Sequence, residues 1–294
     1  MSLMYTIEKM LYIRNRSVPV FREYDERRGF KTWSDECRSS TGRHKPDPER
    51  DILGTQGFTH LRVLPVQTAC DIRRQFDLQD ASLVERKTSA ISQTIAIDDI
   101  NTLKSVVAGA ITSEVDQILF DYFKSEYCAY WYSMQRALPN KKPKRAFLWH
   151  CDKGPTMHAK MLLYFTAVAD TGGNTYLLDR KSTVAFDKAG YLFGSQKNRL
   201  DDLAGLAASN GIPYSPFSFD LTPGEAILFL PHKVLHRGVL PTKAPRFIMQ
   251  ITFLPSKMHW REALFRDNSM SLEELAKDYA WPRNAGDLRL ALGG

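Results

Sequence analysis

The chain has 294 residues, of which 43% are hydrophobic and 25% charged, an ordinary composition for a globular protein. It contains no run of 18 or more uncharged apolar residues, which excludes a helix that spans a membrane. We expect no secretory signal, because no basic segment with an apolar core precedes a small-residue cleavage site. Four cysteines are widely spaced without a CxxC pair, and we therefore expect reduced thiols in a cytoplasmic protein: Cys37, Cys70, Cys128 and Cys151.

The net charge is basic, with 40 Lys and Arg residues against 33 Asp and Glu residues, a balance of +7. Such an excess favours an anionic partner: a phosphorylated or carboxylated metabolite, an acidic sugar, or a nucleic acid. No RRM, KH, zinc-finger or helix-turn-helix signature supports the nucleic acid. A basic surface without any such partner is the alternative, and charge alone does not decide between them.

The N-terminal part of the chain predicts a covering segment followed by helices. Residues 12–56 are polar, basic and interrupted by Pro and Gly, and we therefore predict an irregular arm or covering layer over residues 1–56. Residues 58–64 then alternate as a strand does, and a helix is expected to begin at Pro65 and to reach residue 76. Residues 98–123 carry apolar side chains at helical spacing, so we expect one long amphipathic helix there.

After residue 123 the sequence pattern changes to short apolar runs separated by Pro, Gly, Asn and Asp. This pattern is typical of antiparallel strands in a sandwich or barrel. These runs lie at 128–136, 145–151, 160–168, 174–178, 183–187, 191–194, 216–221, 225–230, 234–240 and 246–254.

Two further segments complete the expected organisation. Residues 180–220 are longer than a hairpin needs and form either a solvated insertion or a lid whose cations meet an anionic substrate. Residues 257–294 form a C-terminal helical tail, since Ser271 and Glu274 make a capping box. We therefore predict an α+β, mainly β fold in which helices pack on one sheet and residues 57–256 form the catalytic domain.

The most informative motif is His150-Cys151-Asp152. On a strand, alternate residues face the same side, so His150 and Asp152 point together and offer two ligands to one divalent ion. A third ligand must come from elsewhere, and His232 and His236 both follow a later predicted strand. Two histidines and one carboxylate on one face leave three positions open, the arrangement of non-haem Fe(II) oxygenases.

An arginine lies ten residues after His236. In the strand that Arg246 begins, Phe247, Met249 and alternate residues beyond form an apolar face, while Arg246 and Gln250 share the opposite one. Burying that second face is costly unless it lines a polar cavity. A fixed guanidinium in such a cavity suits the capture of a carboxylate.

With these motifs in this order, residues 55–256 resemble the Fe(II)- and 2-oxoglutarate-dependent dioxygenase superfamily. Within it they most resemble the phytanoyl-CoA-hydroxylase-like branch. Besides the motifs above, the resemblance uses the Gly57-Phe58 strand with its helix and four short segments: Leu163 to Val168, Gly172 to Thr175, Gly194 to Lys197 and Pro223 to Glu225. It implies a double-stranded β-helix, or jelly-roll, core. Where the family often has Gly-Ser-His, this chain has Gly194-Ser195-Gln196, a departure away from the metal ligands.

The resemblance also implies roles for individual residues. His150, Asp152 and His236 look like the Fe(II) ligands; His236 is preferred to His232 because the family's ligand stands about ten residues before the arginine. Arg246 looks like the clamp on the distal carboxylate of 2-oxoglutarate. Lys160 and Tyr164 share a face of the strand after the motif and are candidates for a second contact. Some related enzymes use a lysine on that strand as the main clamp, which leaves Lys160 and Arg246 in competition.

The expected function is thus hydroxylation, with Fe(II), 2-oxoglutarate and O₂ and with release of succinate and CO₂. The substrate expected is an anionic small molecule, lipid or glycan. One alternative is an oxygenase that acts on nucleic acid or protein. Another is a non-enzymatic cupin-like binding protein, which has no need of an open metal face. The oligomeric state is left open.

Overall fold

The computed structural model describes residues 30–40, 48–80, 92–94, 100–140, 142–152, 157–191, 193 and 196–266. The predicted capping box at Ser271 and the tail beyond residue 266 lie outside these ranges, as does most of the predicted 1–56 segment. Within the described ranges, no helix combines the length and the apolar character that crossing a bilayer requires.

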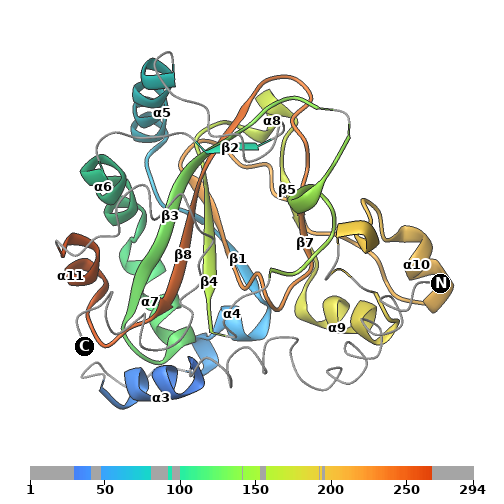
Figure 1. Ribbon diagram of the computed structural model, residues 1–294, viewed down its shortest axis with the longest axis horizontal. Helices are drawn as coiled ribbons and strands as arrows, with labels where there is room; N and C mark the ends of the chain where they lie inside the picture. The colour runs from blue at the N-terminus through green and yellow to red at the C-terminus, as the bar shows by residue number, and fades with distance from the viewer. Residues whose placement is uncertain are drawn as a thin grey trace.

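A six-stranded antiparallel sheet, which we call the major sheet, forms the centre of the described structure (Figure 1). Its strands lie in the order β1-β6-β4-β8-β3-β2. In chain order they are β1 (Phe58–Arg62), β2 (Ser92–Thr94), β3 (Tyr127–Ala137), β4 (Ala159–Tyr164), β6 (Glu225–Phe229) and β8 (Arg246–Pro255). Strand β8 confirms the predicted alternation, because Phe247, Met249, Ile251 and Phe253 all belong to one apolar core.

A second, smaller sheet, which we call the minor sheet, lies opposite the major sheet and consists of β5 (Thr175–Leu177) and β7 (His236–Gly238). Single antiparallel bridges extend it on both sides, from His236 to His150 and from Leu177 to Phe217. From β3 to β8 the chain therefore alternates between the sheets, apart from the step from β5 to Phe217. This strand order is that of a double-stranded β-helix, and the predicted fold is confirmed.

Helices cover the outer face of the major sheet (Figure 1). The main ones are α5 (Val66–Asp80), α6 (Ile100–Ala110), α7 (Ser113–Phe123) and α11 (Trp260–Phe265). Their apolar side chains, among them Leu103, Leu119 and Trp260, join those of the strands in the largest core. Three short helices precede β1 in the chain: α3 (Phe30–Ser40), which lies below the others in Figure 1, the 3-10 helix η1 (Pro48–Arg50) and α4 (Ile52–Thr55). Trp33 of α3 donates a hydrogen bond to the carbonyl of Pro255, 2.9 Å away.

Another layer covers the outer face of the minor sheet. Its helices are α9 (Arg180–Lys188) and α10 (Ala204–Asn210), with the short η3 (Gln196–Asn198) between them. Phe186, Leu203 and Ala207 of this layer form a separate buried cluster with Trp149 and Cys151 of the segment that carries the His-x-Asp motif. The remaining short elements are η2 (Arg145–Phe147) and α8 (Val168–Thr171).

Five sequence expectations about secondary structure were wrong. The helix expected over 98–123 is two helices, because Thr112 caps α7 by accepting a hydrogen bond from the amide of Val115. The strand expected over 183–187 lies inside α9, which Asp179 caps through the amide of Ser182. The runs at 145–151 and 216–221 form only single bridges or a 3-10 turn, and the described residues of the run 191–194, at 191 and 193, belong to no strand.

Candidate metal centre

His150 and His236 lie directly opposite each other, joined by the single antiparallel bridge that extends the minor sheet beyond β7. Each backbone amide donates to the other residue's carbonyl, at 3.0 and 2.9 Å. The two imidazole rings are consequently close, with centroids 4.4 Å apart. Asp152 follows two residues after His150, and its amide is held by the carbonyl of Pro231 at 2.8 Å. Backbone hydrogen bonds thus fix the origin of all three side chains.

The three side chains converge on one point. Oδ1 of Asp152 is 3.3 Å from Nε2 of His150 and 3.7 Å from Nε2 of His236. All three potential ligand atoms lie within 4.8 Å of one another. Ligand bonds from His and carboxylate to a divalent ion such as zinc are about 2.1 Å long, so ligand atoms at right angles stand about 3 Å apart. The spacing fits a facial triad on one divalent ion.

Hydrogen bonds from the far sides of the rings leave both Nε2 atoms available to a metal. Nδ1 of His150 is 2.7 Å from the carbonyl of Leu148, and Nδ1 of His236 is 3.0 Å from that of Val234. A carbonyl only accepts, so each Nδ1 carries the proton and each Nε2 presents its lone pair. Burial, followed by the neighbouring His236, lowers the pKa of His150 to about 4. His150 is therefore a neutral ligand at physiological pH.

The second oxygen of Asp152 has a different partner, the ammonium group of Lys160 on β4. Burial raises the pKa of Asp152, but the lowering influences, chiefly the charge of Lys160, outweigh it and hold that pKa well below its usual range. Asp152 is thus ionised, as a metal ligand must be. The sequence analysis placed Lys160 near the cofactor; its contact with Asp152 was not anticipated.

Arg246 is the first residue of β8 in the major sheet, and its side chain is buried. One guanidinium nitrogen donates to the carbonyl of Asn174, and the group lies 5.9 Å from the ring centroids of both Phe147 and Tyr164. Its Nε atom is buried and has no hydrogen-bond partner in the described structure. A buried donor without an acceptor fits a bound carboxylate at this position.

Tyr164 and Gly173 shape the surroundings of Arg246. The hydroxyl of Tyr164 shares a hydrogen bond of 2.8 Å with that of Thr175, and burial raises its pKa although Arg246 lies nearby. A Cβ at Gly173 would be 3.2 Å from Cδ of Arg246, so a larger residue there would crowd the guanidinium.

His232, the other histidine that the sequence offered as a ligand, lies outside the triad. It is buried, and its ring packs against His158 with centroids 4.6 Å apart. The ring of His236 instead makes a T-shaped contact with that of Phe229, with centroids 5.0 Å apart, and its Nε2 lies 3.7 Å from Oδ1 of Asp152.

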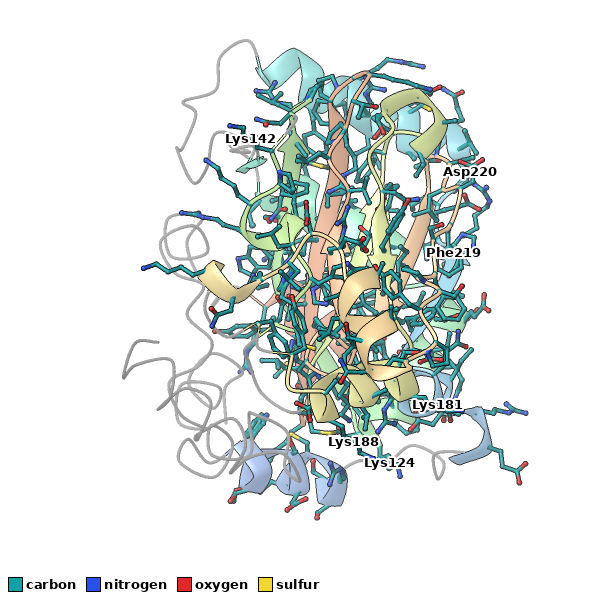
Figure 2. The ribbon with its side chains drawn as sticks, turned by 90° about the vertical axis from the view of Figure 1, so that its right-hand side faces the viewer. Lys124, Lys142, Lys181, Lys188, Phe219 and Asp220 are labelled. Atoms are coloured by element: carbon teal, nitrogen blue, oxygen red, sulfur yellow. The ribbon has the colours of Figure 1, made fainter. Side chains whose placement is uncertain are left out.

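One cation of the segment 180–220, Arg199, interacts electrostatically with Asp152. The sequence analysis did not select this arginine as a site residue. Arg199 is half-buried, and it donates from Nε to the carbonyl of Phe193 and from Nη1 to that of Arg145. Burial lowers its pKa, and the charge of Asp152 is the main influence that raises it. By contrast, Lys181 and Lys188 lie at the lower edge of the α9 layer in Figure 2. No pattern around residue 199 distinguishes this arginine from the exposed Lys181.

Neither a protein-family model nor a curated protein matches the chain. Solved structures do. A prolyl-4-hydroxylase from Pseudomonas putida aligns at 16% identity over 70% of this chain and 97% of its own, with a TM-score of 0.42. EctD from S. alaskensis aligns at 13% identity over 73% of this chain and 80% of its own, with a TM-score of 0.45.

The non-heme alpha ketoglutarate dependent carbocyclase SnoK from nogalamycin biosynthesis aligns at 14% identity over 70% of this chain and 82% of its own, with a TM-score of 0.47. Likeness at this level carries no argument about activity. The case for a function therefore rests on the arrangement of His150, Asp152, His236 and Arg246.

Proposed function

We propose that the protein is an Fe(II)- and 2-oxoglutarate-dependent dioxygenase that hydroxylates an anionic small molecule, lipid or glycan. One observation carries the proposal: His150, Asp152 and His236 present three ligand atoms to one point. A structural metal site usually has a fourth protein ligand, whereas a set of two histidines and one carboxylate leaves positions for a co-substrate and O₂.

In this proposal Nε2 of His150, Nε2 of His236 and Oδ1 of Asp152 hold Fe(II). Bound together, Fe(II) and 2-oxoglutarate supply O₂ activation, with succinate and CO₂ as products. The protein's own part is to fix the ligands and to exclude water. For the second task the chain has a buried apolar cluster that includes Leu162, Ile227 and Phe229, the last of which packs on His236.

We assign the distal carboxylate of 2-oxoglutarate to Arg246, with Tyr164 as a second contact. Support comes from the buried, unpartnered Nε of Arg246 and from the position of Tyr164 beside it. Lys160 was the competing candidate from sequence. Its ammonium contacts Asp152 in this structure, so Lys160 stands at the metal end and Arg246 at the other.

The anionic substrate is supported by Arg199. Its guanidinium is anchored by two carbonyls and interacts electrostatically with Asp152, and we propose that it meets the substrate beside the metal centre. An arginine held in this way suits a carboxylate or phosphate. A cytoplasmic location is part of the proposal, because all four cysteines are free thiols.

Anaerobic addition of Fe(II) and then 2-oxoglutarate tests the activity. The proposal predicts a weak visible charge-transfer band and, after admission of O₂, slow succinate release without any added substrate. Arg246→Met should weaken 2-oxoglutarate binding and leave Fe(II) binding unchanged. Succinate release that is equal in wild type and in Asp152→Ala would refute the enzyme and favour a cupin-like binding protein.

A panel of matched compounds tests the substrate class. Phosphorylated or carboxylated metabolites should stimulate succinate release more than their neutral counterparts do. For a stimulating anion, Arg199→Gln should raise the half-saturating concentration about tenfold or more, the effect of roughly 1.4 kcal/mol. Lys181→Gln, an exposed cation of the same insertion, is the matched control and should change nothing. Stimulation by an oligonucleotide or a peptide instead would favour the macromolecular alternative.

A further inference from the structure

Lys160 occupies an unusual place for a lysine. It lies on β4, an inner strand of the major sheet, and is paired on one side with Phe229 and on the other with Thr252. Only 9% of its surface is exposed. A buried ammonium is costly unless a charged partner and hydrogen bonds compensate it, and the carboxylate of Asp152 is its ion-pair partner.

The two oxygens of Asp152 are thereby divided between two tasks. Oδ1 faces both histidine Nε2 atoms, while Oδ2 is engaged by Lys160. A carboxylate that turned to bind a metal through both oxygens would occupy one of the positions that a facial triad leaves open. A buried ammonium on Oδ2 opposes that rotation.

The register of β4 separates this role from that of a cofactor clamp. Lys160 and Tyr164 lie on the same face four residues apart, which is about 13 Å along a strand. Tyr164 stands beside Arg246, while Phe229, the partner of Lys160, packs on the metal ligand His236. Lys160 is therefore at the metal end.

We infer that Lys160 is a positioning residue that holds Asp152 as a one-oxygen ligand and so keeps the remaining metal positions open. This inference rests on the proposed metal site. It assigns Lys160 to the metal ligand, whereas the clamp role suggested by the sequence assigns it to 2-oxoglutarate.

Binding of Co(II) to the full-length protein tests the inference without any turnover. Lys160→Met, a variant of similar shape that has no ammonium, should weaken Co(II) binding by about 10–100-fold, the usual effect of losing a partner of a metal ligand. Its visible Co(II) spectrum should also change, because Asp152 is free to bind through both oxygens. Lys160→Gln keeps a donor on Oδ2 and should restore part of the affinity and of the wild-type spectrum.

Lys104→Met is the matched control. It also removes a buried lysine, but from α6 on the other side of the major sheet, and should leave the Co(II) spectrum unchanged. Wild-type Co(II) affinity and spectrum in both Lys160 variants, with weaker 2-oxoglutarate binding, would overturn the inference in favour of the clamp. If Lys160→Met does not fold, an unaltered Co(II) spectrum in Lys160→Gln together with weaker 2-oxoglutarate binding overturns it. Failure of the wild type itself to bind Co(II) would instead refute the proposed function.

Discussion

The two sheets of this protein differ in regularity and in what they carry. The major sheet has long strands, such as β3 and β8, whose register is continuous apart from one bulge between Ala129 and Trp131. The minor sheet has two three-residue strands and single bridges, yet it supplies His236 directly and His150 through a bridge. Regular pairing thus provides the support, and the short strands place the ligands.

The difference extends to packing. The outer face of the major sheet belongs to the largest core, together with its covering helices. The minor sheet is covered by α9 and α10, whose side chains form a cluster of their own. Because local stability follows the number of apolar contacts, the two layers should respond differently to substitution.

Loss of a ligand from the minor sheet should have the largest effect. We expect His236→Ala to abolish Co(II) binding and succinate release while the far-UV circular dichroism stays that of the wild type, because the ring lies outside the major core. His232→Ala, four residues away, is the control and should still bind Co(II). Retained metal binding in His236→Ala would show that the triad is not the site.

Truncation in the major sheet should affect the fold instead. Phe253 is fully buried on β8, so Phe253→Ala should lower the free energy of unfolding by about 3–5 kcal/mol. Urea titration measures this loss. At a urea concentration where the variant is still folded, its affinity for Co(II) should equal that of the wild type. A loss below 1 kcal/mol would contradict the account of this core.

The same truncation in the outer layer should cost less. Phe186 of α9 is also fully buried, but its cluster is smaller and can open locally, so we expect Phe186→Ala to lose about 1–3 kcal/mol. Limited proteolysis should then cleave between residues 178 and 215 before it cleaves elsewhere in the described chain. Cleavage first in α6 or α7 would mean that the two layers are one cooperative unit.

Thiol reactivity should give the smallest but most local contrast. Burial raises the pKa of Cys37 and of Cys128 to about 12, and that of Cys151 well above its usual value, so few thiolates exist at pH 8. Half-buried Cys70 should react first with a disulfide reagent, and all four should react after denaturation. In Phe186→Ala, Cys151 should react faster with the reagent than it does in the wild type, while the reaction rates of Cys37 and Cys128 should stay the same. Equal acceleration of all three would contradict separate layers.

The sequence predicted what depends on local pattern. Alternation along residues 246–254 and 58–64 reflects strands with one apolar face, and both became strands of the major sheet. His150 and Asp152 were proposed as ligands from their spacing and His236 from the family resemblance, and the structure brings the three side chains together. What depends on tertiary packing was not accessible: Thr183 to Phe186 have residues typical of strands, but Asp179 starts a helix there that covers the minor sheet.

The sequence also could not predict contacts between residues that lie on different elements of the fold. The pairing of Lys160 with Asp152 joins the end of the His-x-Asp motif to β4 of the opposite sheet, and periodicity says only that Lys160 faces inward. Arg199 approaches Asp152 from a separate helical layer, for which no residue pattern gives a direction. Such contacts require the register of the sheets, which the sequence alone does not specify.

A crystal structure of the protein soaked anaerobically with Fe(II), read by anomalous scattering at the iron edge, tests the central claim most directly. The account predicts one strong peak bonded to Nε2 of His150, Nε2 of His236 and Oδ1 of Asp152, with Lys160 on the other oxygen. A peak elsewhere, or these three side chains unchanged around solvent at saturating Fe(II), would contradict it.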